Sequence, residues 1–504
     1  MEGEHSSLVD NSTCLESYNA QSCQEYLHLH NDNNNDTSND DESSSTKSSV
    51  SQTTFNMVKM CIGTGSLAIP FAASEGGLLF FAIGTFIVVL WNAYDVYLLL
   101  DARQYITSSC SEESKAKSKD NNDDDDDHGV VENQLPRSTV TVTVGEDTSL
   151  NSLSKVALHV FGKYGSNAID FLMILLMVGI IVAYEDAILG FTSETLLTTG
   201  SKRIDALWMI VAITPFLLPN SYEGAAHLSI LGSGLIAAAF IVIGLYGIKE
   251  NNNDGLSGFG FHHLLSLSMW PRNFASFSKW FGVVVFGVGV VPFSYSLQES
   301  MENPDQMMQA TKRSLGIVYI AYSMIGCVIS IIFSHGIETD IISSLPRGYI
   351  PDGLRIVMSL MVCSTVPLIS IPAGELINEK VQFLIGNIDD GLGSGSGSGS
   401  GSGNGFKTRL ILVVLCGIVS VETPNFCYVS SFLGCCCVSI MSFVFPPFLH
   451  LVCLYQYCPR EKLWSKKGLI IFDIVLLLLG VVTTAFTSFL TFGSMVEQMR
   501  LSRL

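Results

Sequence analysis

Charged side chains are scarce in this chain, at 14% of its 504 residues, whereas soluble domains carry about a quarter. The deficit requires long segments without any charge, which excludes an ordinary soluble domain. The chain also lacks a basic start followed by a short apolar run, so we expect no cleavable signal peptide. The first apolar segment is therefore expected to direct the chain to a membrane.

Patterned cysteines and enzyme motifs are missing as well. Most of the thirteen cysteines lie inside apolar segments as small packing residues, and their spacing fits neither a disulfide framework nor a zinc site. No His-Glu-x-x-His zinc pair, P-loop or serine-nucleophile elbow occurs. His335 and Asp340 have the spacing of some acyltransferases, but no other feature of that chemistry accompanies them. We therefore expect no enzyme activity, no cofactor and no metal.

Acidic residues outnumber basic ones, giving a net charge of −19, and the excess lies mainly in two polar segments. Residues 1–54 hold ten acidic residues and one lysine, and residues 101–165 hold twelve acidic and seven basic residues. Acidic segments repel nucleic-acid phosphates, so we expect no nucleic-acid partner.

Composition also divides the chain into ordered and disordered parts. We predict a disordered acidic tail at 1–52, a transmembrane domain at 53–492 and a C-terminal tail at 493–504. Within the domain, the aspartate-rich segment 107–150 and the Gly/Ser repeat 391–405 are predicted to be disordered insertions.

Apolar stretches recur after the acidic tail, each near the roughly 20 residues that a helix needs to cross hydrocarbon. They predict an all-α integral membrane protein with about eleven transmembrane helices in a lipid bilayer. The predicted spans are 55–73, 77–100, 167–190, 205–220, 224–248, 277–298, 314–334, 351–373, 408–423, 426–455 and 468–492.

The distribution of lysine and arginine predicts a cytosolic N-terminus. In that orientation 17 basic residues lie in cytosolic segments and nine lie on the opposite side. The sequence does not separate a vacuolar or lysosomal membrane from the plasma membrane.

The first predicted span is interrupted by a run of mostly small residues, Ile62, Gly63, Thr64, Gly65 and Ser66. Glycine weakens a helix, and freed backbone groups are tolerated at membrane depth only where they line a cavity or are buried in protein. Freed N–H groups can hold a carboxylate, and freed carbonyls can hold an ammonium. The segment therefore predicts a binding site for a molecule with both groups. Close helix packing through small residues is the alternative interpretation.

The sixth predicted span is interrupted in the same way, by Gly287, Gly289 and Pro292. Spans one and six are corresponding members of two five-helix halves. A matched pair of Gly/Pro-interrupted segments points to a midplane binding site. Phe286 and Ser294 flank the second interruption and belong to the same predicted substrate-binding set.

A family resemblance appears in these segments. Lys59–Pro70, with its Ile-Gly-Thr-Gly core, closely resembles the first helix of the amino acid/auxin permease family. Pro292–Pro304 is similar to the exit of that family's sixth helix, and Pro424–Phe426 and Phe445–Pro447 extend the likeness. The resemblance implies an eleven-helix transporter with a five-plus-five inverted repeat, amino acids as substrates, and Tyr184 as a pocket residue.

The resemblance also bears on the coupling ion. Sodium-coupled members of the family carry Asn at the position of Lys59, one turn before the first interruption, whereas proton-coupled animal members carry Lys. A fixed ammonium there would repel sodium, so we expect a proton, although Thr365 matches the other sodium-ligand position. A lysine that reaches back to the interface is the alternative for Lys59. Glu185, beside Asp186, is a further candidate because intramembrane carboxylates serve in proton relays.

These features predict a secondary active, proton-coupled amino acid transporter that works by alternating access. The alternatives are an amino-acid sensor that signals through its tail, or a carrier of another amine-containing solute. Glu299, which ends the broken sixth helix, is predicted either to act in cytosolic gating or to be a solvated helix end. His450 and Asp473 lie near predicted helix ends and are interpreted as interfacial residues.

Overall fold

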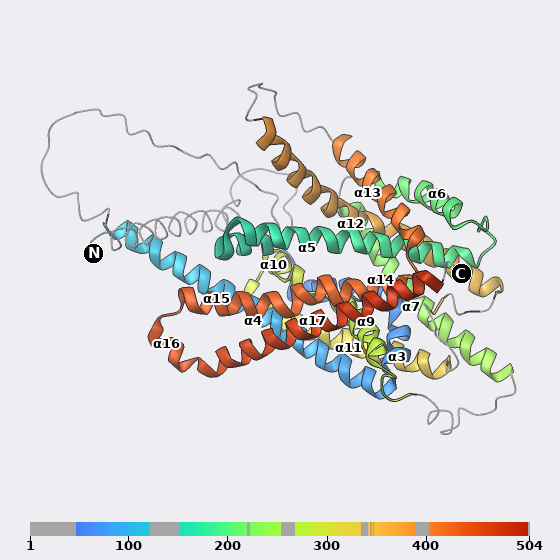
Figure 1. Cartoon of the computed structure of the whole chain (residues 1–504), viewed down its shortest axis with the longest axis horizontal. Coiled ribbons are helices and arrows are strands. Elements are labelled where there is room, and N and C mark those ends of the chain that lie inside the picture. Colours follow the sequence, from blue (N-terminus) through green and yellow to red (C-terminus); the bar gives the residue numbers. More distant parts are fainter. Residues whose placement is uncertain are drawn as a thin grey trace, which may run out of the picture.

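Long helices that run roughly along the longest axis make up the computed structural model of this chain (Figure 1). The structure describes residues 47–120, 152–218, 222–253, 268–333, 341–342, 345, 347–389 and 403–501. Outside these ranges lie most of the predicted acidic tail, much of the insertion 107–150, most of the Gly/Ser repeat, and the pair His335 and Asp340.

The helices of the first half of the domain are α2 (Val50–Cys61), η1 (Thr64–Ala68), α3 (Ile69–Gly76), α4 (Leu78–Asp120), α5 (Ser152–Ser193), α6 (Lys202–Ile213), η2 (Thr214–Leu217) and α7 (Tyr222–Asn253). Those of the second half are α9 (Phe274–Gly287), η3 (Val291–Phe293), α10 (Ser294–Glu299), η4 (Pro304–Gln306), α11 (Met307–Ile332), α12 (Tyr349–Asp389), α13 (Gly403–Glu422), α14 (Phe426–Leu433), η5 (Gly434–Val438), η6 (Ile440–Val444), α15 (Phe445–Tyr457), α16 (Arg460–Ser465) and α17 (Lys467–Leu501).

Seven helices of the described part are long and apolar enough to cross a membrane, and the bent pair of α2 and α3 makes an eighth. The chain is therefore a multi-pass membrane protein, helical over its described residues. Helix also occupies the remaining predicted spans, as α6, α7 and α13. The count of eleven spans and the inverted repeat stay predictions.

Several helices extend past the predicted boundaries. Helix α4 continues to Asp120, into the segment 107–150, and α17 continues to Leu501, into the predicted C-terminal tail. Both helices can continue beyond the apolar layer because a helix satisfies its backbone hydrogen bonds internally, in water as well as in lipid. Helix α2 begins at Val50 because Ser49 and Gln52 form a capping box there.

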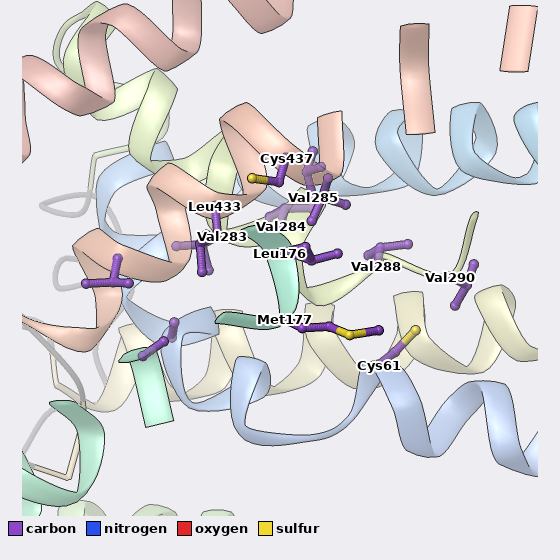
Figure 2. Packing of buried hydrophobic residues seen from close by; sticks show 14 of the residues in the cluster. Cys61, Leu176, Met177, Val283, Val284, Val285, Val288, Val290, Leu433 and Cys437 are labelled. Carbon is purple, nitrogen blue, oxygen red and sulfur yellow. The ribbon is translucent and has the colours of Figure 1, made fainter. Parts of the chain in front are cut away.

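One hydrophobic cluster of buried side chains extends through the helices, and α9 is part of it. Side chains from α2 (Cys61), α5 (Leu176, Met177), α9 (Val283, Val284) and the α14–η5 segment are part of one hydrophobic cluster (Figure 2). The backbones of α9 and α14–η5 approach so closely that a Cβ atom at Gly434 would overlap the carbonyl oxygen of Gly282. Small residues are what allow two membrane helices to pack at this distance.

We expect Gly434→Ala to lower the midpoint of thermal unfolding of the purified protein, because the added methyl group forces α9 and η5 apart. Overpacking of this kind costs about 1–3 kcal/mol. Gly316→Ala on α11 is the matched control, since an added Cβ there meets no atom within 4 Å. An unchanged midpoint for Gly434→Ala would show that this close contact does not hold the bundle together.

Candidate functional site

The first broken helix is interrupted where the sequence predicts it. Helix α2 ends at Cys61, the backbone is extended at Gly63 (φ −100°, ψ −151°), and η1 then leads into α3. The two flanking helical pieces are bent by 50°. The carbonyl of Gly63 accepts hydrogen bonds from the backbone N–H of Ser66 (3.0 Å) and from its buried hydroxyl (2.7 Å). Ile62 is half-buried beside this break, and only the backbone of Thr64 is described.

The second broken helix is interrupted between α9 and η3. Helix α9 ends at Gly287, and the N–H of Val290 bonds the carbonyl of Val288 at 2.7 Å, a tight turn in place of a helical turn. Pro292 lies in the next turn, η3 (Val291–Phe293), and has no backbone N–H to donate. Buried Ser294 donates its hydroxyl to the carbonyl of Val291 at 2.8 Å. A side chain thus replaces part of the lost backbone hydrogen bonding.

The two breaks meet each other. A Cβ atom at Gly65 would lie 3.3 Å from the ring of Phe286 and 3.7 Å from the Cα of Gly287. At Gly289 it would lie 3.2 Å from Val438 of η5. The structure therefore brings Gly65 of span one close to Phe286 and Gly287 of span six, whereas Gly289 lies against η5.

Tyr322 on α11 joins the two breaks and was not among the predicted site residues. Its hydroxyl lies 2.5 Å from the carbonyl oxygen of Cys61 and 3.0 Å from that of Gly287, the last residues of α2 and α9. A hydroxyl has one hydrogen, so it donates to one of these carbonyls at a time. The available signal in the sequence is a tyrosine inside an apolar span, since a buried hydroxyl usually finds a partner.

The predicted coupling residues lie at different places. Lys59 is half-buried one turn before the first break, and Thr365 donates its hydroxyl to the carbonyl of Val362 at 2.8 Å. Glu185 is fully buried, with no hydrogen-bond partner for its carboxylate among the described residues, and faces Gly417 of α13. Tyr184 is half-buried and packs against the hydrophobic core.

Polar contacts join the segment that follows the second break to α4 and to the residues just before α2. Arg103 of α4 pairs with Glu299 at 2.7 Å and donates to Gln298 at 3.0 Å. Ser48, just before α2, exchanges backbone hydrogen bonds with Ser300 (2.8 Å) and Glu302 (3.0 Å). Glu299 is thus an exposed residue at the end of α10 that also joins this helix to α4, and its role in gating stays a prediction.

His450 and Asp473, interpreted from the sequence as interfacial, are in the protein interior: both side chains are completely buried between α4, α15 and α17. Their position relative to the membrane interface stays a prediction, but the sequence did not predict this burial. The reason is that α4 covers them, and the sequence of α15 or α17 alone does not contain that neighbour.

Matched broken helices that meet inside a multi-pass bundle are characteristic of secondary transporters. The chain belongs to the family of transmembrane amino acid transporter proteins, whose family model matches residues 46–492. This finding confirms the resemblance carried by Lys59–Pro70, and with it the prediction of a carrier rather than an enzyme.

Three relatives are similar to this chain. Amino acid transporter ANT1 of Arabidopsis thaliana is 22% identical over 456 residues, covering 88% of this chain and 92% of that protein. Vacuolar amino acid transporter 3 of Schizosaccharomyces pombe is 20% identical over 322 residues, covering 62% and 45%. Solute carrier family 38 member 10 of Mus musculus is 22% identical over 331 residues, covering 63% and 29%. The chain thus spans most of the first relative and less than half of the other two.

We expect Gly65→Val to weaken amino-acid binding by at least about tenfold while the protein still folds, because overpacking costs about 1–3 kcal/mol. The valine methyl groups would press into the ring of Phe286 and push the two breaks apart. Binding of a labelled neutral amino acid to purified protein measures the effect. Gly244→Val on α7, where an added Cβ meets no atom within 4 Å, is the control. Binding by Gly65→Val equal to that of the control would place the site elsewhere.

Proposed function

We propose that this protein is a secondary active, proton-coupled amino acid transporter with eleven spans in a five-plus-five inverted repeat. The observation that carries the proposal is the contact of Gly65 with Phe286 and Gly287, which brings both broken helices to one place. Membership of an amino acid transporter family supports the substrate class.

The backbone at the breaks offers partners for both charged groups of an amino acid. The first backbone N–H groups of a helix lack helical partners and favour a carboxylate, and at the start of η1 we assign this role to those of Thr64 and Gly65, because the N–H of Ser66 already bonds the carbonyl of Gly63. The ammonium would bind to carbonyl oxygens at the ends of α2 and α9. Because Tyr322 donates to only one of Cys61 and Gly287 at a time, the other carbonyl keeps an acceptor position for the substrate.

In the proposed cycle, helices one, two, six and seven (α2–α3, α4, α9–α10 and α11) rock against the others and expose the site to each side in turn. At the end with Glu299, the contact of that residue with Ser152 of α5 joins the two sets and must break for opening. At the other end of the broken sixth helix, the ammonium of Lys279 lies 5.1 Å from the ring centre of Tyr428 on α14, which joins the sets there.

Coupling to protons rather than sodium rests on two residues. Lys59 places an ammonium one turn from the break, where it repels a sodium ion. Glu185 has a buried carboxyl group without a hydrogen-bond partner in the described structure, and such a group is costly to bury as an ion. Thr365, which matches a sodium-ligand position in the family, bonds its own helix through its hydroxyl.

We further propose a cytosolic N-terminus. A vacuolar or lysosomal membrane is one proposed location, supported by the name of the Schizosaccharomyces pombe relative, and the plasma membrane is the other.

Uptake of labelled neutral amino acids into liposomes containing the purified protein tests the proposal. We expect an imposed pH gradient to drive uptake without sodium, and Gly65→Val to abolish it. A strict sodium requirement would keep the transporter and remove the argument from Lys59. Amino-acid binding without uptake under either gradient would instead favour a sensor, and competition by polyamines rather than amino acids would indicate another amine-containing solute.

A further inference from the structure

A histidine lies between two carboxylates where α4, α15 and α17 meet, away from the broken helices. Nδ1 of His450 is 2.7 Å from Oδ2 of Asp473, and Nε2 is 2.9 Å from Oδ2 of Asp101. The side chains of His450 and Asp473 are completely buried, whereas that of Asp101 is 19% exposed. The hydroxyl of Tyr94 donates to the second oxygen of Asp473 at 3.1 Å.

Counting hydrogens shows what this arrangement requires. A neutral imidazole has one N–H group, and its other nitrogen is an acceptor. Both nitrogens of His450 face carboxylate oxygens at hydrogen-bonding distance, so each contact needs a hydrogen. Asp101, His450 and Asp473 together therefore hold one proton more than a neutral histidine and two carboxylates would, either on the imidazole or on a carboxyl group.

The surroundings favour a bound proton. The titratable groups that interact with His450, with its two aspartates or with their neighbours in the described structure are Tyr94, Asp95, Tyr97, Asp101 and Tyr105 from α4, Asp473 from α17, Lys466 from the turn before α17, and Cys458 at the end of α15. Asp95 is fully buried and has no hydrogen-bond partner among the described residues. Helix α5 also packs on α15, and its His159 contacts Tyr457 at 3.1 Å rather than His450 or its aspartates. Carboxyl groups thus outnumber the basic groups here.

The position of these residues ties the proton to a helix interface. Asp101 is on α4, which belongs to the rocking set in the proposed cycle, whereas His450 and Asp473 are on α15 and α17, outside that set. With the extra proton, His450 bonds both aspartates and holds α4 to the other two helices. Without it, one nitrogen lone pair faces a carboxylate, and the contact becomes repulsive.

We propose that Asp101, His450 and Asp473 form the binding site for the coupling proton, which links α4 to α15 and α17 when it is bound. This inference rests on the proposed transport function. Asp101 is the exposed end of the site and connects it to water on the predicted cytosolic side. Release of the proton there loosens α4 and permits the rocking motion.

His450→Gln tests the proposal, because glutamine can still donate and accept hydrogen bonds but does not bind a proton near neutral pH. His159→Gln is the matched control, the same change on α5 outside the cluster. Both variants are compared with wild type in liposomes. One assay measures counterflow of labelled amino acid at equal pH on both sides, and the other measures accumulation driven by a pH gradient.

We expect His159→Gln to keep both activities and His450→Gln to keep counterflow while losing at least about tenfold of the gradient-driven accumulation. Asp473→Asn removes one carboxylate, so the contact with His450 no longer needs an additional proton. We expect this variant also to keep counterflow and to lose gradient-driven accumulation. It replaces His450→Gln as the test if that variant does not fold. Gradient-driven accumulation at the wild-type level in either folded variant would overturn the proposal. The proposal would also be overturned if Glu185→Gln lost gradient-driven accumulation while His450→Gln and Asp473→Asn kept it.

A second measurement does not depend on transport. A proton held only by the folded protein stabilises it at low pH, and this stabilisation is lost as pH rises. The unfolding midpoint of wild type is therefore expected to exceed that of His450→Gln most at roughly pH 6 and least at roughly pH 9. A difference that does not change with pH would overturn the proposal. If wild type shows no counterflow but the pH-dependent difference is present, the transport function fails and the proton site stands.

Discussion

Lipid hydrocarbon offers no hydrogen-bond partner, so every backbone group at membrane depth must be bonded inside the protein or face a polar cavity. This constraint makes the two broken helices the most demanding part of the fold. Ser66 and Ser294 bond carbonyls within their own breaks, and Tyr322 reaches from α11 to one carbonyl in each. The backbone groups that remain are those available to a ligand, which is why the proposed site is made mainly of backbone.

The same constraint decides where charges are found. The contact of Glu299 with Ser152 at one end of the bundle joins helices that separate in the proposed transport cycle, and its exposure to water lowers the free-energy cost of breaking it. A buried ionisable group is costly as an ion unless it is paired, so it either finds a partner or takes up a proton. The cluster around His450 meets this need only by holding an additional proton, so its packing and its protonation are linked.

Much of the fold was predictable because its causes are local. Apolar runs predict the spans, and the glycines at 63, 65, 287 and 289 with Pro292 predict the breaks, since weak helix propensity belongs to the residues themselves. The ends of α4 and α17 were less predictable, because the polar residues that follow a span can either continue the helix or form a loop. Tyr322 was missed because no local sequence pattern identifies it. Its role becomes visible only when the structure places Cys61 and Gly287 beside it.

The sequence by itself determined that the chain spans a membrane several times, that two spans are interrupted, and which family it belongs to. These properties depend on composition and on short runs of neighbouring residues. Only the tertiary structure decided that Gly65 lies close to Phe286, that the buried carboxylate of Glu185 has no hydrogen-bond partner among the described residues, and that His450 lies between Asp101 and Asp473. The reason is that each of these facts concerns contacts between helices, and Asp101 lies about 350 residues from His450 along the chain.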